Sequence, residues 1–78
     1  MATKVKGWVI TLRKCKSTWH WFTQNPQGGG GGSSIMSSKK MALTLALRLV
    51  PSGETITVLT KDCYGGRKIL NVETMRKS

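Results

Sequence analysis

The chain has 78 residues, a length that allows one small domain at most. It carries 13 Lys and Arg residues against 3 Asp and Glu residues, which gives a net charge of +10. Such a surface attracts polyanions, so we expect nucleic acid as the partner, with an acidic protein surface or a merely solvated surface as alternatives. No apolar run approaches the roughly 18 residues of a transmembrane helix, so we expect no membrane contact.

The chain has two cysteines, Cys15 and Cys63, and one histidine, His20. The cysteines form no CxxC pair, and no group of His and Cys residues has the spacing of zinc ligands, so we predict no metal and no cofactor. Nothing in the sequence suggests secretion. We therefore predict a cytoplasmic protein with two free thiols, with a disulfide between the two cysteines as the alternative.

The N-terminal part of the chain predicts a β-hairpin. Residues 5–15, VKGWVITLRKC, alternate loosely and are rich in β-branched and aromatic residues, and residues 18–24, TWHWFTQ, form a second such run. The two residues between them fit a tight turn. Trp19 and Trp21 share one face of the second strand, and His20 lies on the other face, where we expect it to be half-buried.

Residues 25–34, NPQGGGGGSS, contain five consecutive glycines. Glycine loses more backbone entropy on ordering than any other residue. We therefore predict a flexible glycine-rich loop over 25–34, either a spacer before the next element or a loop that closes over a ligand. The run lacks the Lys-Ser/Thr ending of a phosphate-binding P-loop.

The next segment predicts a helix that ends at about Leu49, with Ser37 or Ser38 as its N-cap. Apolar residues alternate strictly from Met41 to Leu49, which also fits a strand, but the alanines, the leucines and the serine caps favour a helix. Because this helix is apolar nearly all round, we expect it to be buried on more than one side. The PSG sequence at 51–53 ends it.

The C-terminal third predicts a strand and a second helix. Residues 54–60, ETITVLT, are a β-branched run typical of a strand. Ile69, Val72 and Met75 fit one stripe of a helix, and Asp62 could cap it. The predicted fold is therefore α+β, in the order β-β-α-β-α, with the helices packed on the sheet in one domain over residues 1–78.

Two stretches, SSKKMALTLALRLV at 37–50 and TVLTKDCYGG at 57–66, resemble a helix and a strand that occur in this order in the ribonuclease H-like superfamily. In that family, the helix and the strand each carry an acidic residue. The carboxylates hold two metal ions that hydrolyse the RNA strand of a hybrid. The resemblance implies a small sheet that lacks the first strand of the family, which carries the first catalytic aspartate.

The residues that match the catalytic positions are not acidic. Ala42 matches the helix acid and Lys61 matches the aspartate that ends the strand. Magnesium needs oxygen ligands, which neither side chain offers, and Asp62 could not hold two metals alone. We therefore expect no hydrolysis by the family mechanism, and no arrangement of Ser, His, Cys or Asp suggests another enzyme.

The charge balance and the resemblance together predict a catalytically inactive, ribonuclease H-like protein that binds nucleic acid through phosphate contacts. In the family, residues just before the helix Met contact the minor groove, which implies an RNA duplex or an RNA/DNA hybrid as the partner, read by shape and 2′-hydroxyls. The matching residues are Ser37, Ser38, Lys39 and Lys40. The other expected phosphate contacts are Lys14, Lys16, Lys61, Arg67 and Lys68. Trp19 and Trp21 would either stack on bases or pack in the core.

The alternative function is that of a small phage or mobile-element protein that binds and inhibits or redirects a host enzyme. The absent first strand would leave a sheet edge exposed, and such an edge can pair with a host protein or with a second copy of the chain. A third possibility is a diverged regulatory subunit that holds substrate for another nuclease. A viral protein of this kind would act in the host cytoplasm.

Overall fold

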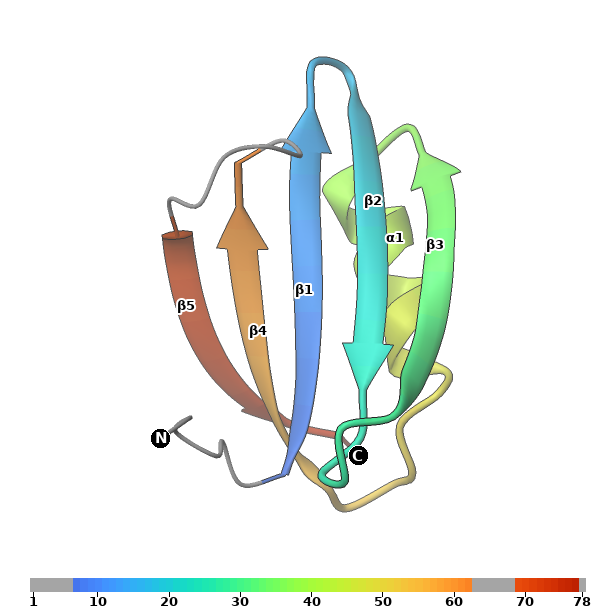
Figure 1. The fold of residues 1–78 in the computed structure, drawn as a ribbon, viewed down its shortest axis with the longest axis vertical. Coiled ribbons are helices and arrows are strands. Elements are labelled where there is room, and N and C mark those ends of the chain that lie inside the picture. The colour runs from blue at the N-terminus through green and yellow to red at the C-terminus, as the bar shows by residue number, and fades with distance from the viewer. Residues whose placement is uncertain (1–6, 63–68, 78) are drawn as a thin grey trace.

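The structure, a computed structural model, describes residues 7–62 and 69–77. Within these residues, one five-stranded sheet carries one helix on one of its faces (Figure 1). The elements are β1 (Trp8–Cys15), β2 (Thr18–Gln24), β3 (Gly30–Met36), α1 (Lys39–Leu47), β4 (Thr55–Lys61) and β5 (Ile69–Arg76). The fold is therefore mixed α+β, as the sequence predicts.

The strands lie in the order β3-β2-β1-β4-β5 across the sheet. β1, β2 and β3 are antiparallel neighbours, β4 runs parallel to β1, and β5 runs antiparallel to β4. α1 connects β3 to β4 and contacts β1, β2 and β3 on one face of the sheet. The opposite face is nearer the viewer in Figure 1 and carries no described element. We call it the open face.

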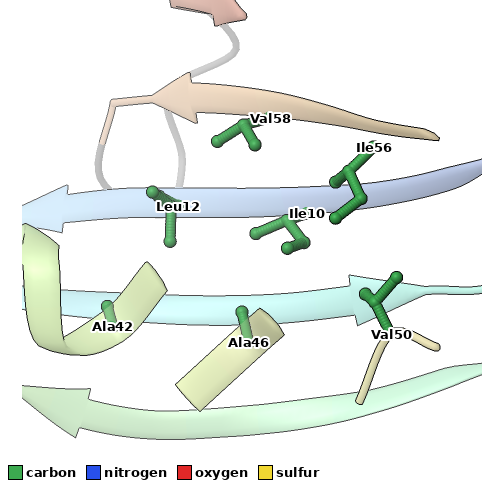
Figure 2. Close-up of a cluster of buried hydrophobic side chains, with 7 residues drawn as sticks. All are labelled: Ile10, Leu12, Ala42, Ala46, Val50, Ile56 and Val58. Atoms are coloured by element: carbon green, nitrogen blue, oxygen red, sulfur yellow. The ribbon is translucent and has the colours of Figure 1, made fainter. Parts of the chain in front are cut away.

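The core lies between α1 and the sheet, as Figure 2 shows. Side chains alternate along a strand, so Ile10 and Leu12 of β1 both point toward the helix. The hydroxyl of Thr23 is buried there too, and it donates a 2.9 Å hydrogen bond to the carbonyl oxygen of Ala46, which ties β2 to α1. The seven buried apolar residues are Ile10, Leu12, Ala42, Ala46, Val50, Ile56 and Val58.

The helix begins as predicted and ends slightly early. Ser38 is the N-cap, and its hydroxyl oxygen accepts a 3.2 Å hydrogen bond from the backbone N–H of Met41. α1 ends at Leu47 rather than at about Leu49. There the ammonium group of Lys77 donates to the carbonyl oxygens of Leu47 and Val50 at 2.6 and 2.7 Å, which ties the C-terminal end of the chain to the end of the helix.

The expectation that the helix is buried on more than one side is wrong. Its fully buried residues are Ala42 and Ala46, which face the sheet. Met41 on the outer side is 48% exposed. The helix packs on one face of one sheet, and no described element covers its other side.

The prediction of a flexible loop over 25–34 is wrong for the second half of that segment, because β3 begins at Gly30 and pairs with β2. Gly32 has a φ of 139°, and a Cβ at this position would lie 2.5 Å from the ring of Trp21. The missing side chain lets the indole ring lie against the edge strand. Pairing with β2 and this close contact order a segment whose local propensity favours disorder.

The second predicted helix is also wrong, because residues 69–76 form strand β5. The strand pairs with β4 from Thr55 opposite Arg76 to Lys61 opposite Ile69. Strand propensity depends mainly on the neighbours a strand finds, and here pairing with β4 outweighs the helical spacing of the apolar residues. Asp62 follows β4 and has no described helix to cap.

The observed order is β-β-β-α-β-β, in place of β-β-α-β-α. Three strands precede α1, one more than predicted. β1, the first of them, reads WVITLRKC and contains no carboxylate.

Cys15 is disulfide-bonded, so the prediction of a free thiol is wrong at this position. Cys63, the second cysteine of the sequence, lies outside the described residues. The cytoplasmic location stays a prediction, and free thiols no longer support it. In the part of the chain that the structure describes, no helix has the length and apolar character needed to cross a membrane.

Candidate nucleic-acid interface

Basic residues concentrate where β1, β3 and β4 end and α1 begins. These ends of the elements lie in the upper part of Figure 1. Of the 13 Lys and Arg residues, four lie outside the described residues, namely Lys4, Lys6, Arg67 and Lys68. Six of the remaining nine lie at this end of the sheet, which we call the basic end. They are Arg13, Lys14, Lys16, Lys39, Lys40 and Lys61.

The basic end has one half on each face of the sheet. Arg13 and Lys61 lie opposite each other in the pairing of β1 with β4. Their side chains lie on the open face, because the neighbouring Leu12 and its partner Thr60 are buried on the helix side. Lys14 alternates to the helix side and carries its ammonium group 5.9 Å from the centroid of the Trp19 ring.

The first turn of α1 forms the helix-side half. Lys39 and Lys40 are the first two residues of the helix, and Lys40 is exposed. Ser38 caps the helix, and the hydroxyl of Ser37 donates a hydrogen bond to the sulfur of Met41 at 3.7 Å. No acidic residue lies in this turn, so the partial positive charge of the helix N-terminus adds to the two lysines.

Carboxylates are scarce at the basic end. Asp62 follows β4 there, and its backbone carbonyl oxygen accepts a 3.3 Å hydrogen bond from Nη1 of Arg13. Glu54 precedes β4 at the opposite end of that strand, and Glu73 lies in the middle of β5. One carboxylate against six cations leaves the basic end strongly positive, which suits a polyanion.

The two tryptophans expected to stack or pack are both packed. Trp19 and Trp21 are partly buried and lie against the core. The indole nitrogen of Trp21 is buried and finds no hydrogen-bond acceptor among the described residues. Both rings contact the core, and the Trp21 ring also lies against Gly32, so neither ring is part of the candidate interface, and base stacking on them stays a prediction.

The two positions that match catalytic acids do not face a common site. Ala42 is fully buried under the helix, whereas Lys61 lies on the open face. Across residues 7–62 and 69–77, no three His, Cys, Asp or Glu side chains come together in a way that could hold a metal ion. The lack of enzymatic activity stays a prediction.

Residues missed by the sequence reasoning lie on the open face. Arg13 was not among the expected contacts, although the alternation of β1 already separates it from Leu12. Phe22 was likewise overlooked, and its ring is 41% exposed. The alternation along β1 and β2 already places both residues on one face of the sheet. It does not show that this face is uncovered, because the sequence predicts a helix at residues 69–76 that would pack on the sheet.

One further hollow adjoins the basic end. It is an open, mostly apolar groove of about 270 Å³ along the outer side of α1. Its lining residues are Met36, Lys40, Met41, Thr44, Leu45 and Arg48. An apolar lining does not suit a phosphate backbone, so the groove is not part of the candidate interface.

Comparison of this chain with protein-family models, with curated proteins and with solved structures found no match.

Proposed function

We propose that this protein is a non-enzymatic nucleic-acid-binding protein that holds a phosphate backbone at its basic end. The observation that carries the proposal is the gathering there of six Lys and Arg side chains beside a single carboxylate, that of Asp62. Lys and Arg contacts to phosphate position a nucleic acid and carry little sequence information. Binding is therefore strong at low salt and weakly dependent on sequence.

An RNA duplex or an RNA/DNA hybrid is the preferred partner in this proposal, and a ribonuclease H-like origin is part of it. Two observations support that origin: the helix and the strand that carry the resemblance are both formed, and three strands precede the helix. Ser37 to Lys40 then take the place of the minor-groove contacts. The buried Ala42 and the cation at Lys61 support the lack of hydrolysis.

Fluorescence anisotropy with labelled RNA duplex, hybrid, DNA duplex and single strands at low salt tests the proposal. We expect all of them to bind, the RNA-containing duplexes most tightly. Lys40→Ala should weaken binding more than Arg48→Ala. The two residues are exposed cations near opposite ends of the same helix, so each variant removes one charge.

Absence of binding to every one of these nucleic acids at low salt would refute the proposal. Equal losses for the two variants would mean that total charge, rather than the basic end, determines affinity. A thermal unfolding curve for each variant checks that the fold is retained.

The second candidate function is binding of a host enzyme, and the edges of the sheet favour it. β3 and β5 are the two edge strands, and Ile35 on β3 is 67% exposed. An edge of this kind can accept a strand from a host protein or from a second copy of the chain. Failure to bind any nucleic acid, together with a concentration-dependent dimer in sedimentation, would favour pairing through an edge.

A further inference from the structure

The open face carries ordered rows of side chains across the strands. The row nearest the basic end is cationic in its centre, and the next row is mainly apolar. The first row runs Ile35, His20, Arg13, Lys61 and Ile69 from β3 to β5. The second row runs Phe22, Thr11, Leu59 and Val72 from β2 to β5.

Phe22 is the aromatic residue of the second row, and its surroundings leave the ring accessible. Its neighbour on β1 is Thr11, and on β3 it pairs with Gly32. A Cβ at Gly32 would point toward Trp21 on the other face, so no side chain of β3 lies beside the ring at this position. The ring is 41% exposed, and Val72 at the end of the same row is 56% exposed. An exposed aromatic ring on an open sheet is a surface on which a base can stack.

The charged side chains that the described strands place on this face are all cationic. Arg13 and Lys61 lie side by side on it, and Arg76 lies opposite Thr55 at the far end of β4. Glu73 lies on the other face, because it pairs with Val58, which is buried toward the helix. The carboxylates of Glu54 and Asp62 belong to residues just outside β4. The described strands therefore present cations and no carboxylate on the open face.

We propose that the open face binds an unpaired strand of nucleic acid that continues from a duplex held at the basic end. In this arrangement a base stacks on Phe22, and Arg13 and Lys61 contact the phosphates where the strand passes from the basic end onto the sheet. The inference rests on the proposed function, because the same polyanion contacts both surfaces. It adds a place for bases, which the basic end alone does not offer.

A second copy of the chain suits this face less well. Packing two open faces together would place Arg13, Lys61 and Arg76 of both copies in one interface, and like charges in a dry interface are costly. An unpaired nucleic-acid strand supplies the opposite charge and flat bases at the same time. Charge complementarity therefore favours nucleic acid as the occupant.

Two forms of one RNA duplex test the inference. One form is blunt, and the other carries an unpaired overhang of about six nucleotides, a length within the usual range for single-strand sites. We expect the overhang to tighten binding by roughly 5- to 150-fold, the range expected for one stacked base. Phe22→Leu should abolish this gain and leave the affinity for the blunt duplex unchanged, whereas Phe22→Tyr should keep the gain.

Leucine keeps an apolar side chain but removes the ring, so the comparison separates stacking from general apolar contact. Leu49→Ala is the matched control, because Leu49 is similarly exposed, at 46%, but follows the helix and lies off the sheet. Unchanged blunt-duplex affinity shows that each variant is folded.

The inference would be overturned if the overhang does not tighten binding, or if the overhang still tightens binding to Phe22→Leu. In either case, binding of the blunt duplex would still support the proposed function. If neither duplex binds, the proposed function and the inference fall together. A dimer of the free protein that Phe22→Asp dissociates would assign the face to a second copy and would also overturn the inference.

Discussion

Arg13 and Lys61 lie directly opposite each other on the parallel strands β1 and β4. Neighbouring strands are about 4.8 Å apart, so the two positive side chains lie side by side on the same face of the sheet. Like charges placed opposite each other reduce the stability of a sheet. A phosphate that binds between them would contact both charges, which connects this pair with the proposed function.

Replacing Lys61 by Gln should therefore affect stability and binding in opposite directions. We expect the free energy of unfolding to rise by about 0.2–1 kcal/mol as the repulsion with Arg13 disappears, and the affinity for RNA duplex to fall. Urea unfolding and anisotropy measure the two effects. Arg48→Gln is the control for net charge, because this residue lies at the end of the helix rather than at the basic end. A Lys61→Gln protein that is less stable than the original would contradict the prediction.

Restoring an acid at Ala42 should damage the fold without creating a nuclease. Ala42 is fully buried against the sheet, so a glutamate there both overpacks the core and buries a carboxylate. We expect Ala42→Glu to lower the free energy of unfolding by at least about 3 kcal/mol. Thr44→Glu, on the exposed side of the same helix, should change it by no more than about 0.5 kcal/mol.

Urea unfolding of both variants, together with a cleavage assay on RNA/DNA hybrid with magnesium, measures these outcomes. Magnesium-dependent cleavage by Ala42→Glu would show that this position does face a metal site. Equal stability of the two variants would show that Ala42 is not in the core.

Two neighbouring glycines of β3 should respond differently to alanine. A Cβ at Gly32 would lie 2.5 Å from the Trp21 ring, and the φ of 139° is unfavourable for alanine, whereas a Cβ at Gly31 meets no atom within 4 Å. We expect Gly32→Ala to cost about 1–3 kcal/mol of stability. Gly31→Ala should stay within about 0.5 kcal/mol of the original. Similar unfolding midpoints for the two variants would mean that β3 is not held against Trp21.

The disulfide at Cys15 should contribute measurably to stability. We expect Cys15→Ser to lower the free energy of unfolding by about 2–4 kcal/mol, the usual contribution of such a bond. The original protein unfolded in the presence of a reductant should match Cys15→Ser. Labelling of Cys15 by a thiol reagent in the native, unreduced protein, or equal stability with and without reductant, would contradict this.

The sequence predicted those elements whose local residue pattern favours the same structure as the contacts they make in the fold. The hairpin of β1 and β2, the Ser38 cap and strand β4 were all predicted close to their observed positions. β3 was missed because glycines carry no strand propensity, and its order comes from pairing with β2 and from the contact of Gly32 with Trp21. β5 was missed because Ile69, Val72 and Met75 also have helical spacing, and only the neighbouring β4 decides between the two.

The candidate site was predictable only in part, because the sequence predicts most of the strands that carry it but not which face of the sheet stays uncovered. Lys14, Lys39 and Lys61 were expected contacts, and the topology brings all three to the basic end. Arg13 of the basic end was missed, and so was Phe22, which lies outside the basic end on the open face, although their strands were predicted. Alternation shows which residues share a face, but it does not show which face stays uncovered. A helix at residues 69–76 would have needed a face of the sheet, and the strand found there leaves the face with Phe22 open.

The central claim is that the basic end binds a phosphate backbone, and the salt dependence of RNA-duplex binding tests it most directly. With about five phosphate contacts, log K should fall with log[salt] at a slope of about −4 to −5. Lys39→Ala combined with Lys40→Ala should flatten the slope by about 2. A binding constant that hardly changes with salt, or a slope that the double variant leaves unchanged, would contradict the claim.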